Sequence, residues 1–138
     1  MNALNRFADP VYCIMRFIVG LLYASHGGQK ILHFPPGGHG AAGGLMLIGG
    51  WIELVCGFLI AFGLITRIAA FIASGEMAVA YFMVHAHGGF YPIQNRGEFA
   101  VALCWIFLFM IFYGPGMWSI DTLLARNRVA RPVTRATV

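Results

Sequence analysis

Three charged residues stand inside stretches of sequence that are otherwise apolar: Arg16, Glu53 and Glu76. A charge inside an apolar membrane segment costs several kcal/mol and is rarely kept without a partner or a task. The long side chain of Arg16 is expected to reach Glu76, or Glu53. That pairing would neutralise one carboxylate and leave the other to hold a proton.

Two interpretations of this buried charge network stay open. In the first, the network is a structural clamp that holds three helices together, since buried ionic groups often serve specificity. In the second, the carboxyl that is not paired carries a proton to or from a bound redox ligand. The clamp is the favoured interpretation at this point.

Polar residues also gather toward one end of the apolar stretches, called here the outer end. All five histidines fall there or in the adjoining loop: His26, His33, His39, His85 and His87. Polar side chains that converge at the mouth of a helical bundle form a candidate ligand pocket. The candidate ligand-binding residues are His26, Lys30, His87, Asn95 and Glu98.

Helical spacing predicts which of these side chains point inward. The first apolar stretch carries a polar and small-residue stripe at Arg16, Gly20, Tyr23, Gly27 and Lys30, which recur on one face of a helix. In the third stretch, His87 follows Glu76 by eleven residues and would share its face. His85 would lie about half a turn away.

Four apolar stretches position these residues, each near the length that crosses roughly 30 Å of hydrocarbon as a helix. They span residues 11–32, 43–65, 68–87 and 97–113. We therefore predict an all-α fold, an integral membrane four-helix bundle within residues 1–125. A short amphipathic segment capped by Ser119 should follow the fourth helix. The basic tail, 126–138, is expected to be disordered and cytoplasmic.

The composition agrees with a membrane location. Hydrophobic residues make up 59% of the 138 residues and charged residues 10%, whereas a soluble domain has about a quarter charged residues. The mean hydropathy is +0.76. The net charge of +4 comes from the arginines of the tail. A basic tail beside apolar helices indicates the cytoplasmic side and contact with anionic lipid, and argues against nucleic acid.

An even number of spans puts both termini on one side, so we expect both in the cytoplasm and the chain in the cytoplasmic (inner) membrane. The three cysteines, Cys13, Cys56 and Cys104, lie in three different apolar stretches and form no disulfide framework. No metal site is predicted.

These landmarks, in this order and spacing, resemble the DoxX family of small four-helix membrane proteins. The matching stretches are Arg16…His26-Gly27-x-x-Lys30, Gly50-x-x-Glu53-x-x-x-Gly57, Gly63-Leu64-x-Thr66-Arg67, Glu76, Pro92-x-x-Asn95-x-Gly97-Glu98 and Gly114-Pro115-Gly116-x-x-Ser119-x-Asp121. The resemblance implies a multi-pass protein of the cytoplasmic membrane linked to redox work. Relatives include the small subunit of an archaeal thiosulfate:quinone oxidoreductase.

The expected function is therefore a membrane subunit that binds a quinone-like ligand at the outer mouth and supports electron and proton transfer. If the chain is an enzyme, it is a quinone-linked oxidoreductase subunit. A partner protein would supply the redox centre, because the sequence has no cluster motif and no nucleotide loop. The alternative is a non-catalytic anchor or assembly partner, and a homo-oligomer fits either function. Haem held by His26 and His87 ranks below quinone, and a small transporter ranks last.

Overall fold

The computed structural model describes residues 2–38, 40 and 43–129, and these ranges form helices and connecting turns. The elements are α1 (Asn2–Asn5), α2 (Ala8–Leu32), α3 (Leu45–Phe62), α4 (Thr66–Ala80), the π-helix η1 (Tyr81–His85), the 3-10 helix η2 (Ala86–Gly88), α5 (Pro92–Asn95), α6 (Glu98–Tyr113) and α7 (Ile120–Val129).

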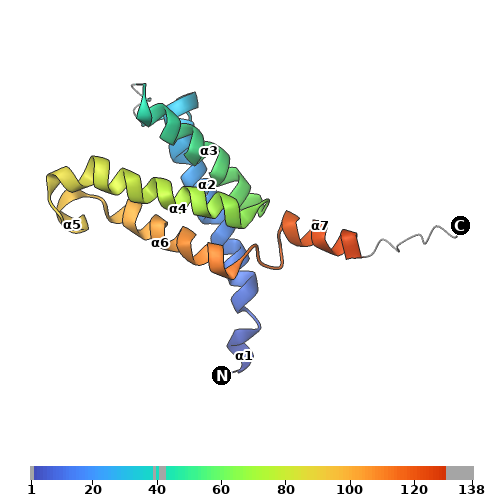
Figure 1. Ribbon diagram of the computed structural model, residues 1–138. Coiled ribbons are helices and arrows are strands. Elements are labelled where there is room, and N and C mark those ends of the chain that lie inside the picture. Colours follow the sequence, from blue (N-terminus) through green and yellow to red (C-terminus); the bar gives the residue numbers. More distant parts are fainter. Residues whose placement is uncertain (1, 39, 41–42, 130–138) are drawn as a thin grey trace, which may run out of the picture.

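The long helices are arranged as two hairpins. Helix α2 packs along α3, α4 packs along α6, and α3 joins the two hairpins by packing against α4. Figure 1 shows that the hairpins cross steeply and that α7 projects away from both. The described start of α2 and the end of α6 lie at the same end of the molecule, where Tyr113 donates a hydrogen bond to Asp9.

Glycines bring α2 and α3 into backbone contact. A Cβ atom on Gly20 would lie 2.5 Å from the backbone N of Ala61, and one on Gly27 would overlap the backbone of Leu54. Close approach through small residues is a common way for helices to associate in a membrane. These contacts also fix the register of the antiparallel pair, because Gly20 must lie level with Ala61 and Gly27 with Leu54.

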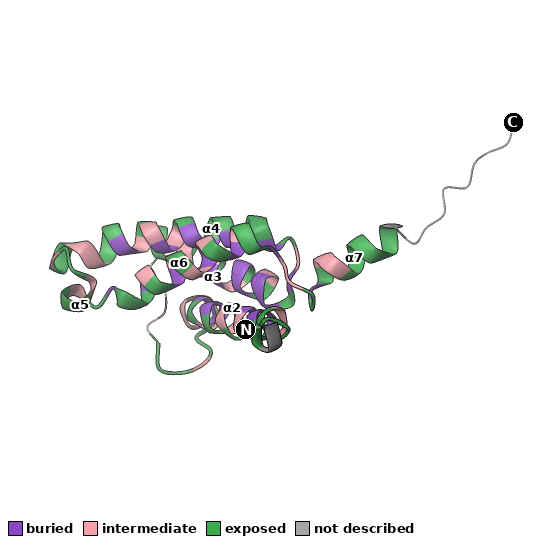
Figure 2. Cartoon of the chain, turned by 90° about the horizontal axis from the view of Figure 1, so that it is seen from below, coloured by how far each residue is buried: buried purple, intermediate pink, exposed green. Residues whose placement is uncertain are grey.

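Large apolar side chains cover the outer faces of the helices. Phe71, Trp105 and Phe112 are 68%, 66% and 76% exposed, and Figure 2 shows the buried positions confined to stripes. Helices α2 and α3, and the segment Thr66–Gly88, are long and apolar enough to cross a membrane, while α6 is a shorter apolar helix. An apolar exterior of this kind suits lipid as the surrounding solvent.

A helical segment lies within three residues of each end of the four predicted spans, and three of the four segments are long enough to cross a membrane. Beyond them, the backbone N–H of Thr122 donates to Ser119 Oγ at 3.1 Å, so Ser119 caps α7 as predicted. Helix α7 continues to Val129. The first residues of the predicted disordered tail, from Arg126 to Val129, are therefore helical, and the remainder of the tail lies outside the described residues.

Candidate functional site

An ion pair joins α2 to α3 in the outer half of the first hairpin. Lys30 Nζ lies 2.7 Å from Glu53 Oε2 and donates a hydrogen bond of 2.8 Å to Oε1. The Glu53 side chain is 4% exposed and that of Lys30 is 27% exposed. Because the contact of Gly27 with Leu54 sets the register, Lys30 lies about one turn beyond Glu53 and its side chain reaches back to the carboxylate.

The second membrane carboxyl has a different partner. Tyr23, on α2, is completely buried and donates a hydrogen bond of 2.9 Å to Glu76 Oε2, on α4. Glu76 itself is half-buried. A Cβ atom on Gly49 of α3 would lie 3.3 Å from Glu76 Oε1. The glycine therefore leaves space beside a carboxyl that any larger side chain would fill.

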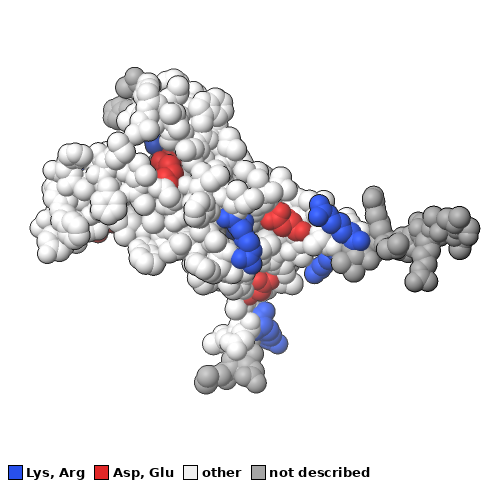
Figure 3. Space-filling view, in the orientation of Figure 1, with Lys and Arg blue, Asp and Glu red and all other residues white. Residues whose placement is uncertain are grey.

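Tyr23, Lys30, Glu53 and Glu76 are called here the carboxylate cluster. It contains one cation and two carboxyl groups, and in the described part of the chain the cation is paired with Glu53. A phenol hydroxyl can donate a hydrogen bond to Glu76 but cannot balance its charge. Figure 3 shows acidic atoms beside a small basic patch in the angle between the two hairpins, so the cluster reaches the molecular surface.

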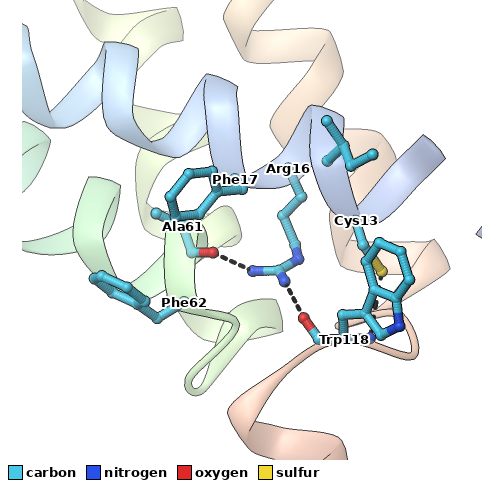
Figure 4. Close-up of a pocket in the computed structure, with 7 residues that line it drawn as sticks. Cys13, Arg16, Phe17, Ala61, Phe62 and Trp118 are labelled. Carbon is cyan, nitrogen blue, oxygen red and sulfur yellow. Dashed lines mark hydrogen bonds between the residues drawn. The ribbon is translucent and has the colours of Figure 1, made fainter. Parts of the chain in front are cut away.

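The predicted pairing of Arg16 with a carboxylate is wrong. Arg16 is 2% exposed, and its guanidinium donates to three backbone carbonyls: that of Ile60, that of Ala61 at 2.8 Å and that of Trp118 at 2.7 Å. Figure 4 shows the guanidinium between Ala61 and Trp118.

The helix register explains why Arg16 and Glu53 do not meet. Since Gly20 is level with Ala61, Arg16 lies at the carboxyl end of α3, where unpaired carbonyls attract a cation. Glu53 is level with Gly27, which is about 15 Å further along the helix. Lys30 is much closer to Glu53 than Arg16 is, and it takes the place predicted for the arginine.

The five candidate ligand residues, His26, Lys30, His87, Asn95 and Glu98, are not joined to one another by polar contacts in the described part of the chain. His26 is exposed and its ring packs against Phe99. Glu98 is exposed in the first turn of α6. Of the five, only Lys30 belongs to the carboxylate cluster.

The prediction that His87 shares the face of Glu76 while His85 points away from it is also wrong. His87 is exposed, whereas His85 Nδ1 lies 3.2 Å from the carbonyl oxygen of Asn95. The cause is the π-helix Tyr81–His85, which has more residues per turn than an α-helix and so rotates the side chains after it. His26 and His87 are both exposed.

Asn95 holds a loop together. Its Nδ2 donates to the carbonyl of Gly89 at 2.7 Å, and its Oδ1 accepts from the N–H of Gly97 at 2.8 Å. These bonds fix the connection between η2 and α6. Within residues 2–38, 40 and 43–129, no group of three His, Cys, Asp or Glu side chains is placed to hold a metal ion.

Sequence reasoning missed two roles. Tyr23 was placed correctly on the inward face of α2, but its hydroxyl was not assigned to Glu76. Asp121 accepts hydrogen bonds from the N–H groups of Ile65 and Thr66, at 2.8 and 2.9 Å, and from the Thr66 hydroxyl. It thereby caps the amino end of α4. The sequence showed only that Asp121 follows Gly114-Pro115-Gly116 at a fixed spacing. That spacing does not indicate that Asp121 bonds to Ile65 and Thr66.

The electrostatics of Asp121 follow from this cap. Partial burial acts to raise the pKa of the Asp121 carboxyl. The hydrogen bonds from Thr66 and Ile65, together with the charge of Arg16, outweigh burial and hold the pKa below its ordinary value.

Apolar helices of membrane length, lipid-suited outer faces and an ionic cluster between helices define a multi-pass membrane protein. Residues 11–86 match the family model of DoxX, and the chain belongs to the DoxX family. It is 41% identical over 128 residues to an uncharacterized protein of Haemophilus influenzae, covering 88% of this chain and 96% of that one. It is 30% identical over 145 residues to an uncharacterized membrane protein of Mycobacterium tuberculosis, covering 92% and 89%. No solved structure matches it.

Proposed function

We propose that this chain is a subunit of a redox system in the cytoplasmic membrane and binds a quinone-like ligand at the carboxylate cluster. The observation that carries the proposal is Glu76, a half-exposed carboxyl in an apolar helix whose described hydrogen-bond partner is the Tyr23 hydroxyl. An ionisable group inside the membrane region is a functional-site candidate by default. The neighbouring Glu53 differs because Lys30 already pairs with it.

The residues of the cluster fit the polar part of a quinone. Its carbonyl oxygens need hydrogen-bond donors, which the partly exposed Lys30 ammonium and a protonated Glu76 carboxyl would supply. Its apolar tail would lie against the lipid-facing sides of the helices. When bound, a quinone supplies a two-electron, two-proton couple, and the electrons would come from a partner protein. Glu76 would hold and transfer a proton, for which a carboxyl in a poorly hydrated place is suited.

The test compares two glutamates that differ in position. Glu76→Gln removes the titratable group from the cluster, while Glu98→Gln changes an exposed glutamate that lies outside it. We expect the first variant to bind ubiquinone or menaquinone in nanodiscs about tenfold or more weakly, since hydrogen bonds to charged groups contribute about 1.5–3 kcal/mol. Glu98→Gln should bind as wild type does. Equal losses of quinone affinity in the two variants would indicate that Glu76 is not part of the binding site.

A non-catalytic anchor or assembly partner is the second candidate. The observation that favours it is that Arg16, Asp9 and Asp121 all bond to backbone groups and tie the ends of the helices together. Organic extraction of the purified protein, followed by mass spectrometry, separates the two functions. Wild-type protein that carries no quinone and binds none in nanodiscs would leave the anchor as the function.

A further inference from the structure

Helix α7 has a narrow apolar face with an arginine at each edge. At about 100° per residue, Ile120, Leu123 and Leu124 fall on one side of the helix together with Asn127, and Arg126 and Arg128 fall on its two flanks. Leu123 and Leu124 are 58% and 47% exposed. This arrangement is typical of a helix that lies at a membrane interface, with its apolar face inward and its cations beside lipid phosphates.

The described part of the chain does not cover this face. Figures 1 and 2 show α7 leaving the two hairpins, and the burial colours of Figure 2 mark most of the helix as exposed. The beginning of the helix is fixed, because Asp121 bonds to the start of α4 and its N–H donates to Gly63 at 2.9 Å. The helix therefore starts from a fixed point at the end of the membrane-spanning region.

The end of the molecule at which α7 starts carries a surplus of positive charge, and it is called here the arginine rim. Its arginines are Arg6, Arg16, Arg67, Arg126 and Arg128, and its acids are Asp9 and Asp121. Both aspartates accept hydrogen bonds from backbone N–H groups. The ion pair of the described residues lies elsewhere, between Lys30 and Glu53. Figure 3 shows the basic atoms gathered around this end.

A groove of about 300 Å³ opens on the rim just before α7. It is lined by Cys13, Ile14, Arg16, Phe17, Ala61, Phe62 and Trp118. Phe17, Phe62 and Trp118 are half-exposed apolar walls, and the guanidinium of Arg16 lies at the base (Figure 4). Within the described residues, the buried Arg16 Nε has no hydrogen-bond partner. The groove thus combines an apolar wall with a cation at its base.

We propose that the arginine rim binds an anionic phospholipid of the adjoining leaflet. One acyl chain lies in the groove against Phe17, Phe62 and Trp118, and the phosphate lies beside Arg126 and Arg128 of α7. Charge complementarity favours this occupant, because the rim has five arginines against two aspartates, and Arg126 and Arg128 are exposed. An apolar wall next to cations matches a lipid, which carries both parts, better than a free phosphate, which has no apolar part.

The experiment uses the full chain with Trp51→Phe and Trp105→Phe, which leaves Trp118 in the groove as the only tryptophan. Nanodiscs of phosphatidylcholine receive an equal mole fraction of brominated phosphatidylglycerol or brominated phosphatidylcholine. Bromine quenches a nearby indole, so the anionic lipid should quench Trp118 more strongly. An arginine near the surface contributes about 1 kcal/mol, so Arg126→Gln with Arg128→Gln should weaken the preference about fivefold or more.

Two controls keep the outcome specific. Arg126→Lys with Arg128→Lys retains the charges and should retain the preference. Arg96→Asn removes an exposed charge in the loop before α6 and should also leave it unchanged, since asparagine tolerates the positive φ of 58° at that position. Equal quenching of the wild type by both lipids overturns the proposal, as does an unchanged preference in the double Gln variant. Loss of the preference on adding inorganic phosphate would identify a small-anion site and also overturn it.

Discussion

Within the carboxylate cluster, Glu53 and Glu76 are stabilised in different ways. Glu53 is 3% exposed and pairs with Lys30, so its charge is balanced inside the protein. Glu76 receives a hydrogen bond from Tyr23 and stays half-exposed. The first arrangement balances the charge with a cation, and the second supplies a hydrogen bond without a charge. The two glutamates should therefore respond differently to substitution.

Removing one partner of the Lys30–Glu53 pair should lower the free energy of unfolding more than replacing both partners with apolar residues. Lys30→Met leaves a buried, unpaired carboxylate, which typically costs about 3–5 kcal/mol. The double variant Lys30→Met, Glu53→Leu removes both charges and should recover most of that loss. The free energy of unfolding can be measured by titration with sodium dodecyl sulfate in mixed micelles. Losses that simply add in the double variant would contradict a direct pair.

Arg16 and Arg67 offer a matched pair of arginines that both donate to backbone carbonyls. Arg16 is 2% exposed and bonds to three carbonyls, whereas Arg67 is exposed and bonds to Ile111 and Phe112. Arg16→Leu should therefore lower stability by roughly 2–3 kcal/mol, and Arg67→Leu by less than about 1 kcal/mol. Thermal unfolding in detergent measures both. Equal losses would show that burial of the guanidinium does not matter here.

At the scale of elements, sequence periodicity predicted the four apolar helices but not which charges meet across them. The inward stripe of α2 was predicted correctly, because regular spacing fixes it. The partner of Arg16 depends on the register of α2 against α3, and that register is set by glycine contacts that spacing alone does not reveal. The π-helix at Tyr81–His85 has no clear sequence signal, so the facing of His87 could not be predicted.

The glycine contacts can be tested with two helix glycines. A Cβ atom on Gly57 would lie 2.5 Å from the backbone N of Ala24, while one on Gly75 would meet nothing within 4 Å. Gly57→Ala should push α2 and α3 apart and lower stability by about 1–3 kcal/mol. Gly75→Ala should leave stability unchanged or raise it by up to about 1 kcal/mol, because alanine restricts the unfolded chain. Melting temperatures in detergent give the comparison.

The cap that Asp121 places on α4 should show in the dependence of stability on pH. The pKa of this carboxyl is lowered on folding, from an unfolded value of about 3.9. Its contribution is therefore fully present above about pH 4 and is lost as the pH falls through the folded pKa. Asp121→Asn should be less stable than wild type at pH 7, and the difference should shrink below pH 4. A difference that stays constant from pH 7 to pH 3 would argue against the ionised cap.

At the scale of the whole molecule, the polar groups separate into two sets. The carboxylate cluster lies in the angle between the hairpins, and the arginine rim joins the start of α2, the α3–α4 turn and the start of α7. The hydrogen bonds at the rim hold helix ends together, since Arg16 donates to the carbonyl of Ala61 and Asp121 accepts from the N–H of Ile65. In the described residues, the Tyr23 hydroxyl donates the hydrogen bond that links Glu76 to α2.

The arginine rim also predicts the orientation of the chain in the membrane. Basic residues near span ends are retained on the cytoplasmic side, so the rim and both termini should be cytoplasmic. The loop after α2 should be outside, because α2 has 25 residues and extends about 37 Å away from the rim.

Pro36 is exposed in that loop. Pro36→Cys can therefore be introduced as a labelling site in a chain whose own cysteines, Cys13, Cys56 and Cys104, are replaced by alanine. A membrane-impermeant maleimide should label it in spheroplasts, while a reporter fused after Val138 should be active only in the cytoplasm. Labelling of Pro36→Cys in inverted vesicles alone would place the arginine rim on the outer side. The anionic phospholipid proposed for the rim would then have to come from the outer leaflet.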